Sequence, residues 1–368
     1  MRGSALTELL ADHTTLRVGG PARRFVTATT ADELVRVVSG CDASGEPVLV
    51  LGGGSNVLVG DAGFDGTVVH IATRGIDADA ATAALTVAAG EPWDAAVAAA
   101  VARGWAGIEA LSGIPGTAGA TPVQNVGAYG QEIAQTVASV RAWDRRTGRE
   151  TAFTAGECGF GYRTSRFKRE PDRWLVLEVA FRLTPGASAP IRYAELAGRL
   201  GVAPGAQAPL ADVRAAVLEL RRGKGMVPDD ADHDTWSAGS FFTNPALDAP
   251  AAAALPPDAP RYPADGGRIK TSAAWLIEHA GFGKGYGTPV ASLSTKHVLA
   301  LTNRGGATAA DILALAVEVR DGVRRRFGVE LIPEPVLVGV GWPAGVDSAA
   351  LRGGVSVKSS RRMKGPHD

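Results

Sequence analysis

The sequence predicts an α+β fold in which small helices lie on an open sheet. Short apolar runs such as Val48 to Leu51 are typical of buried strands. The glycine turn Gly52 to Asn56 leads at once into the strand-like run Val57 to Val59, so it joins two strands. A dinucleotide fold of the Rossmann kind needs a GxGxxG turn that opens a helix, which this stretch lacks. The turn therefore predicts either a backbone nest for a pyrophosphate or a tight hairpin turn.

Capping residues and apolar spacing locate the helices. Thr30 and Glu33 form a capping box that predicts a short helix ending at Gly40. Pro92 starts an Ala-rich helix that ends at Gly104. Further helices are expected over residues 211–222, over 272–279, and from the Thr308 cap to the Gly328 stop, the last with Ile312, Leu315, Ala316, Val319 and Val323 facing the core.

Further strands are expected where short apolar runs recur, over residues 67–71, 85–88, 137–143, 174–183 and 336–340. Residues 246–263 are rich in Ala and Pro and are expected to form an exposed insertion. The basic stretch 346–368 lacks apolar periodicity and is expected to be a disordered tail.

Composition excludes several classes of protein. The 368 residues suggest two or three domains, and 38 Lys and Arg balance 38 Asp and Glu, which gives no electrostatic case for nucleic acid or a membrane surface. No apolar run approaches a membrane span, so we expect a cytoplasmic protein. Cys41 and Cys158 suit buried thiols in a reducing compartment. The six histidines show no metal-ligand spacing, and no metal site is predicted.

The stretch from Leu111 to Gly130 organises the chain. Its glycines allow positive φ angles and remove side-chain bulk, while Pro115 and Pro122 stiffen it. A long loop without its own secondary structure is usually functional, and successive N–H groups in such a loop form concavities for anions. The loop therefore favours a phosphate-bearing cofactor over a surface turn or linker.

Three short stretches place a reactive group beside rigid or apolar residues. Arg163 follows GFGY, and its planar guanidinium suits a carboxylate or phosphate. Ser240 stands between glycine and two phenylalanines, and Glu334 is held extended between two prolines. Taken singly, the structural explanation is as good as the functional one for the serine, as a strand start, and is favoured for the other two, as a surface arginine and a strand-edge glutamate.

In this order and at roughly these separations, GGGSN, SGIPGTAGATPVQNVGAYGQE, GYR, GSFFTNP and PEP resemble the UDP-N-acetylenolpyruvoylglucosamine reductase family, in the longer form that carries a loop tyrosine. The resemblance covers nearly the whole chain. It implies an FAD-binding fold of the vanillyl-alcohol-oxidase (PCMH) type with a C-terminal α/β substrate-binding domain. It also implies that FAD and NADPH serve to reduce UDP-N-acetylglucosamine-enolpyruvate to UDP-N-acetylmuramate, a precursor of peptidoglycan.

The resemblance also implies domain boundaries. Residues 1–70, completed by 330–345, are expected to form the first FAD-binding subdomain, and 71–210 the second. Residues 211–329 are expected to form the substrate-binding domain. We expect a monomer.

The resemblance assigns roles to individual residues. Arg163, Ser240 and Glu334 match the catalytic positions, and His297 stands where the family carries a substrate-binding glutamine. Residues expected to bind FAD are Gly52, Gly53, Gly54, Ser55, Asn56, Ser112, Pro115, Gly116, Gly119, Ala120, Asn125, Gly127 and Ala128. Residues expected to bind the substrate are Tyr162, Tyr193, Lys224, Asn244 and His297.

The chemistry explains why these groups are needed. Hydride addition to the terminal vinyl carbon leaves negative charge on the α-carbon and its carboxylate, which Arg163 would stabilise and Glu334 would polarise. Ser240 would then give the α-carbon its proton. Two alternatives stay open from sequence: another flavoenzyme of the same fold, such as an oxidase of alcohols or sugars, and a non-catalytic protein that binds a nucleotide-sugar.

Overall fold

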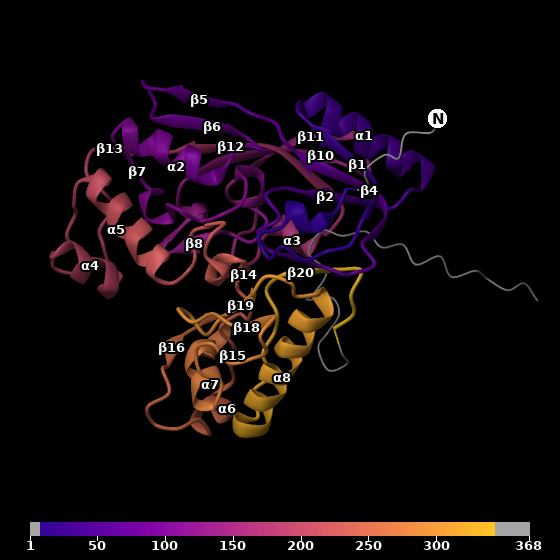
Figure 1. Cartoon of the computed structure of the whole chain (residues 1–368). Helices are drawn as coiled ribbons and strands as arrows, with labels where there is room; N and C mark the ends of the chain where they lie inside the picture. Colours follow the sequence, from indigo (N-terminus) through magenta and orange to yellow (C-terminus); the bar gives the residue numbers. More distant parts are fainter. Residues whose placement is uncertain (1–7, 343–368) are drawn as a thin grey trace, which may run out of the picture.

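The computed structural model of the protein describes residues 8–342, and Figure 1 shows them in two parts. The elements from β1 to α5 form the larger part, and those from β14 to α8 form the smaller part below it. The tail expected over 346–368 lies outside the described residues.

The first layer of the larger part is a parallel sheet of order β1-β4-β2. Its elements are β1 (Ala22–Ala28), α1 (Ala31–Ser44), β2 (Val48–Leu51) and β4 (Phe64–Ile71). A separate parallel pair joins β3 (Val57–Val59) to β20 (Val336–Val338), so the end of the chain returns to its beginning. As the sequence predicts, the glycine turn after β2 joins two strands.

The second layer is an antiparallel sheet of order β11-β10-β12-β6-β5. Its strands are β5 (Ile76–Asp79), β6 (Ala84–Ala88), β10 (Val137–Asp144), β11 (Arg149–Thr154) and β12 (Trp174–Arg182). One apolar core joins both layers, because Leu34 and Val38 of α1 pack in the same cluster as Val87, Trp93 and Phe181. Trp93 opens α2 (Trp93–Ala102) and packs against the ring of Phe181 at 5.5 Å between centroids.

Short elements complete this part. The helices are α3 (Arg166–Arg169), α4 (Ala194–Leu200) and α5 (Leu210–Gly223), and α5 packs against both α4 and α2. Two-residue strands are β7 (Trp105–Ala106), β8 (Gly127–Ala128), β9 (Gln131–Glu132) and β13 (Thr184–Pro185). Between residues 8 and 342, single 3-10 turns lie at Leu10–His13, Glu109–Leu111, Ala118–Ala120, Ile133–Gln135, His233–Thr235 and Asp265–Gly267.

The smaller part has two antiparallel sheets. Its elements are β14 (Ser237–Ser240), β15 (Ala246–Leu247), α6 (Ala249–Ala253), β16 (Tyr262–Pro263), β17 (Ile269–Lys270), α7 (Ala273–His279), β18 (Ala291–Leu293), β19 (Ala300–Asn303) and α8 (Ala309–Phe327). Leu16 and Val18, which precede β1, insert into its core beside Phe241 and Phe242. The amide of Asn303 donates to the Leu16 and Arg17 carbonyls at 3.3 and 3.0 Å. The N-terminal segment therefore fastens the two parts together.

Helix α8 begins and ends as the sequence predicts. The Thr308 hydroxyl accepts from the Asp311 amide, the Asp311 carboxylate accepts from the Thr308 amide, and Gly328 closes the helix at φ 67°. The prediction for α1 was wrong at its end. The helix passes through the exposed Gly40 and stops at Gly45, because its last turn begins with Cys41, which is buried in the core.

The stretch 246–263 is exposed at most of its positions, as expected, but three of its residues are buried. Asp248 caps α6 by accepting from the Ala251 amide, and Ala252, Leu255 and Ala259 are at most 4% exposed. Leu255 and Ala259 thus join the core of the smaller part, whereas the prolines of this stretch stay at least partly exposed. The spacing of the buried residues did not reveal this, because a helix of five residues is too short to show an apolar period.

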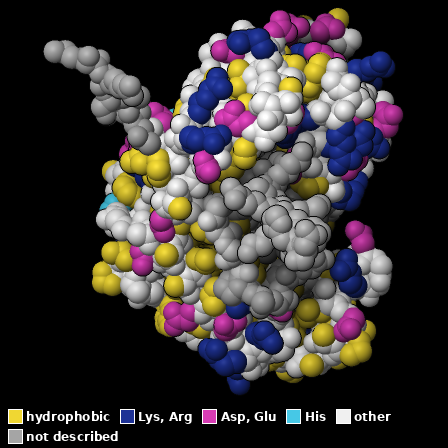
Figure 2. Space-filling model, turned by 90° about the vertical axis from the view of Figure 1, so that its right-hand side faces the viewer, with side chains coloured by type: hydrophobic (Ala, Val, Ile, Leu, Met, Phe, Trp, Pro, Cys, Tyr) yellow, Lys and Arg dark blue, Asp and Glu magenta, His cyan; other side chains and the backbone are white. Residues whose placement is uncertain are grey.

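Figure 2 shows one face of the molecule, on which positive and negative side chains are interspersed. None of the helices described between residues 8 and 342 is long and apolar enough to cross a membrane.

Candidate active site

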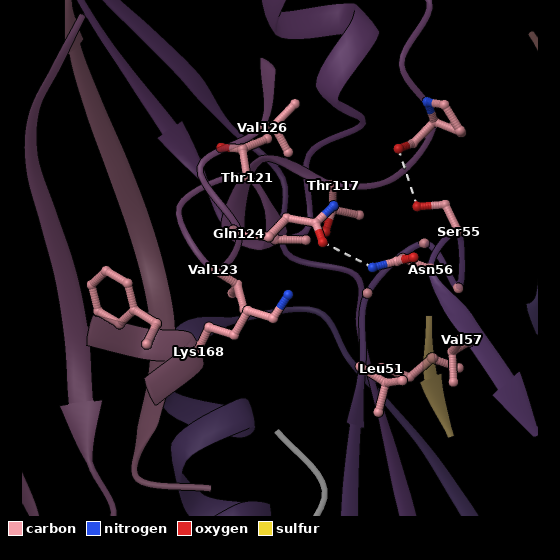
Figure 3. A pocket seen from close by; sticks show the side chains of 18 of the residues that line it. Leu51, Ser55, Asn56, Val57, Thr117, Thr121, Val123, Gln124, Val126 and Lys168 are labelled. Carbon is pink, nitrogen blue, oxygen red and sulfur yellow. Dashed lines mark hydrogen bonds between the residues drawn. The ribbon is translucent and has the colours of Figure 1, made fainter. Parts of the chain in front are cut away.

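The β2–β3 turn and the long loop that the sequence singles out both line a cavity of about 360 Å³. Figure 3 shows two hydrogen bonds between these segments. The amide of Asn56 donates to Gln124 Oε1 at 2.9 Å, and the hydroxyl of Ser55 donates to the Pro115 carbonyl at 3.1 Å. The turn and the loop thus form one wall built from two distant parts of the sequence.

The glycines of this wall serve a purpose that the sequence did not reveal. A Cβ on Gly53 would lie 2.8 Å from the Cα of Gly116, and a Cβ on Gly52 would lie 2.7 Å from the hydroxyl of Thr117. Such distances are too short for a real side chain. The absence of side chains therefore lets the turn and the loop approach each other, which shapes the cavity before any ligand binds.

The residues expected to bind FAD divide into two groups. Those that line the cavity are Gly52, Gly53, Gly54, Ser55, Asn56, Pro115, Gly119, Ala120 and Gly127. The other four, Ser112, Gly116, Asn125 and Ala128, are not among the residues that line it. The buried Ser112 hydroxyl donates to the Glu109 carbonyl, and the Asn125 amide nitrogen donates to Glu132 and to the Gly161 carbonyl. We infer that these two residues brace the loop from outside the cavity.

Arg221 of α5 also lines the cavity and was missed by the sequence analysis. Its side chain is buried, one terminal nitrogen donates to the Met226 carbonyl at 2.8 Å, and its Nε has no hydrogen-bond partner in the described chain. Burial lowers the pKa of Arg221 to about 10. A signal was present, because Arg221 follows Val217 by four residues and so lies on the apolar face of α5. An arginine at a core position needs an acceptor.

The three expected catalytic residues line this same cavity, although they lie far apart in sequence. Ser240 ends β14. The next residue, Phe241, accepts a backbone hydrogen bond from Glu334 at 2.8 Å, which fixes the serine and the glutamate on neighbouring segments. The carboxylate of Glu334 lies 3.6 Å from Arg163 Nε, and its side chain is only 9% exposed. The site therefore presents a hydroxyl, a carboxylate and a guanidinium at one end of the cavity.

Two expected substrate residues line a second cavity of about 1100 Å³. Tyr162 and Asn244 both lie there, and Asn244 also accepts from the Ala273 amide at 2.9 Å. Arg163 and Lys168 line both cavities. The second cavity therefore adjoins the catalytic end of the first.

The remaining expected substrate residues line neither of these two cavities. Tyr193 packs edge-on against Tyr129 at 5.3 Å, and Lys224 pairs with Glu195 at 2.6 Å. His297 lies close enough to Lys224 to feel its charge, since burial and then Lys224 lower its pKa to about 4. These side chains form a separate group between α4, the end of α5 and the segment before β19.

The described residues, 8–342, give no support to a metal site or to a cysteine nucleophile. No group of three or more His, Cys, Asp or Glu side chains there is arranged to hold a metal ion. The two cysteines are buried and free, and burial raises the pKa of Cys158 to about 11, which makes it a poor nucleophile.

Comparison with known proteins gives the family. Residues 22–153 match the family model of an FAD binding domain, and residues 230–338 match that of the C-terminal domain of UDP-N-acetylenolpyruvoylglucosamine reductase. The UDP-N-acetylenolpyruvoylglucosamine reductase of Cutibacterium acnes is 57% identical over 337 residues, which cover 90% of this chain and 89% of the relative. That of Thermobifida fusca is 57% identical over 345 residues, covering 90% and 97%.

A solved structure agrees. The crystal structure of UDP-N-acetylenolpyruvylglucosamine reductase from Thermus caldophilus matches with a TM-score of 0.64 at 28% identity, over 90% of this chain and 97% of that one. The expected α+β class, with an FAD-binding domain followed by a distinct C-terminal domain, is thus confirmed. Because relatives 57% identical span nine-tenths of its length, the chain belongs to the UDP-N-acetylenolpyruvoylglucosamine reductase family.

Proposed function

We propose that this protein is an FAD-dependent UDP-N-acetylmuramate dehydrogenase. It reduces the enolpyruvyl group of UDP-N-acetylglucosamine-enolpyruvate with electrons from NADPH and so forms UDP-N-acetylmuramate for peptidoglycan synthesis. Family membership supports the reaction and both cofactors. The observation that carries the proposal is the meeting of Arg163, Ser240 and Glu334 at one end of a cavity walled by glycine loops.

The cavity fits FAD in its chemistry. Its wall is made of backbone from the β2–β3 turn and the long loop, which suits a pyrophosphate. The unpartnered Nε of Arg221 supplies a buried donor for an oxygen of the cofactor. When bound, FAD supplies the hydride that reaches the terminal vinyl carbon of the substrate.

Arg163 acts on the substrate carboxylate, and Glu334 acts through Arg163. Hydride addition leaves an electron pair on the α-carbon, and this charge spreads into the adjoining carboxylate. The fixed guanidinium of Arg163 faces that developing charge and lowers the barrier by about 3 kcal/mol, as other preorganised donors do. Glu334 lies 3.6 Å from the guanidinium and orients it.

Ser240 gives a proton to the α-carbon. A hydroxyl is a weak acid, but it is adequate against a carbanion-like centre within hydrogen-bond reach. Ser240 lies on the wall of the cavity with Arg163 and Glu334. The proton from Ser240 and the hydride from the cofactor together saturate the double bond.

The substrate is held by two groups of residues. Tyr162 and Asn244 lie in the second cavity, beside the catalytic end of the first. Tyr193, Lys224 and His297 lie together elsewhere, so they reach the nucleotide-sugar only if the segment carrying Tyr193 moves on binding. The paired Lys224 and Glu195 must then separate for the ammonium to meet a phosphate.

We further propose the domain division expected from the sequence, with residues 1–70 and 330–345, 71–210, and 211–329 as its three units. The pairing of β20 with β3 supports the first unit, because it returns the end of the chain to the start. Helix α5 opens the third unit but packs against α2 and α4 of the second. The protein acts as a monomer. It works in the cytoplasm, and its free, buried cysteines support that compartment. Size-exclusion chromatography with light scattering tests the oligomeric state.

The test follows the colour of the flavin. The purified protein is expected to be yellow, to bleach when NADPH is added without oxygen, and to recover when enolpyruvyl-UDP-N-acetylglucosamine follows. Bleaching without recovery by that compound would indicate another flavoenzyme. A colourless protein that neither binds FAD nor consumes NADPH would leave a non-catalytic binding protein.

Variants of one strand test the proton donor. Ser240→Ala is expected to abolish recovery of the colour, whereas Ser240→Cys is expected to keep part of it. Ser237→Ala, on the same strand, removes a buried hydroxyl that lines neither of the two cavities and serves as the matched control. Near-normal recovery in Ser240→Ala would exclude Ser240 as the donor.

A further inference from the structure

Lys168 stands in the wall between the two cavities and has no role in the function described so far. It belongs to the short helix α3, close behind Arg163. Figure 3 shows its ammonium group pointing into the first cavity, between the segment carrying Val123 and Gln124 and the strand of Leu51. Burial lowers the pKa of Lys168, and the nearby Glu334 carboxylate opposes that shift.

The ammonium of Lys168 holds the backbone of Arg163. Its Nζ donates to the Arg163 carbonyl at 3.2 Å, the one hydrogen bond that this ammonium makes in the described chain. Arg163 has a φ of 52°, in the left-handed region that residues other than glycine rarely adopt. Such a conformation persists only where the surroundings fix it. The contact from Lys168 is therefore placed where it restrains the catalytic arginine.

Neighbouring hydrogen bonds fix both ends of this contact. Gly161 and Thr164 exchange backbone hydrogen bonds of 3.0 and 3.2 Å around Arg163. The Ser165 hydroxyl accepts from the Lys168 amide and donates to the Val123 carbonyl at 2.6 Å, which ties α3 to the long loop. Lys168 thus donates to the Arg163 carbonyl from a helix that is itself hydrogen-bonded to the long loop.

We propose that Lys168 is a positioning residue for Arg163, holding the strained backbone from which the guanidinium reaches Glu334 and the substrate carboxylate. The inference rests on the proposed function. Arg163 acts on charge that develops on the substrate, so loss of Lys168 harms the step in which substrate reoxidises the flavin. Reduction of the flavin by NADPH does not need that charge stabilised.

The experiment measures the two half-reactions separately by stopped-flow absorbance. Lys168→Met is expected to slow flavin reoxidation by enolpyruvyl-UDP-N-acetylglucosamine by about 10- to 100-fold, as a misplacement of ~1 Å at a catalytic group does. Flavin reduction by NADPH in the FAD-loaded protein and the melting temperature are expected to stay close to those of the wild type. Lys168→Arg, which can still donate to the carbonyl, is expected to restore most of the rate.

Arg166 offers a control on the same helix, because it lines neither of these two cavities. Its guanidinium lies over the Phe153 ring at 4.9 Å, so Arg166→Met removes a positive charge of α3 outside the site. Its reoxidation rate is expected to match that of the wild type. If Lys168→Met does not fold, Lys168→Gln, whose polar tip is one atom shorter, is expected to slow reoxidation at least tenfold while leaving reduction unchanged.

The outcomes separate the inference from the proposed function. If the wild type is reoxidised by this substrate and the Lys168 variants are as fast, Lys168 does not position Arg163. Equal slowing of both half-reactions with a lowered melting temperature would show a purely structural role and would also overturn the inference. If the wild type itself is not reoxidised, the proposed function fails and the inference falls with it.

Discussion

Acidification is expected to destabilise the wild-type protein more than a His297→Gln variant. His297 lies in the segment before β19, where burial is the main cause of its low pKa and the positive charges of Lys224 and Lys284 add to it. The imidazole therefore stays neutral in the folded protein at a pH where it would be charged in the unfolded chain. Glutamine has no charge to gain, so it removes this difference.

The magnitude follows from the two pKa values. The ordinary pKa is 6.5, and the folded value is about 4. Above pH 6.5 His297 is neutral in both the folded and the unfolded state, so it takes nothing from the free energy of unfolding. As the pH falls from 6.5 towards 4, only the unfolded state gains the proton, so stability is lost. Between pH 7 and pH 5 the loss from His297 is about 2 kcal/mol.

The assay compares urea unfolding of the two proteins at pH 7 and pH 5, followed by tryptophan fluorescence. The quantity of interest is how much more free energy of unfolding the wild type loses than His297→Gln over that interval. Histidine NMR signals provide an independent check, since the signal missing in the variant should not titrate above pH 5. Equal losses in the two proteins, with a His297 signal that titrates near pH 6.5, would refute the reasoning.

Three further predictions concern the backbone of the wall and the helices. Gly53→Ala places a Cβ 2.8 Å from the Cα of Gly116 and should push the β2–β3 turn away from the long loop. A larger dissociation constant for FAD in a fluorescence titration would reveal this. Gly40→Ala should leave FAD binding unchanged and raise stability by about 0.5–1 kcal/mol, because a Cβ at this exposed helical position meets nothing within 4 Å. Thr308→Ala removes its half of the capping box with Asp311 and should lower the free energy of unfolding by about 1 kcal/mol, whereas Thr308→Ser should not.

Local signals were sufficient for most elements and for the reacting groups. The cap at Thr308 and the stop at Gly328 are contacts within one helix, so neighbouring residues encode them. Arg163, Ser240 and Glu334 could be identified because their short motifs follow one another along the chain in the same order as in the family. The prediction for α1 ended the helix too early at Gly40, because burial of the next residue, Cys41, outweighs the cost of a glycine inside a helix.

The sequence by itself therefore determined the fold class, the family, the glycine segments and the identity of the three reacting side chains. Tertiary structure alone decided that Gly53 lies against Gly116, that Arg221 is buried with an open donor, and that Lys168 grips the carbonyl of Arg163. The physical reason is how far apart in the sequence the contacting residues lie. Caps and periods act between residues a few positions apart, whereas a cavity wall depends on how two sheets and a separate C-terminal part bring remote backbone together.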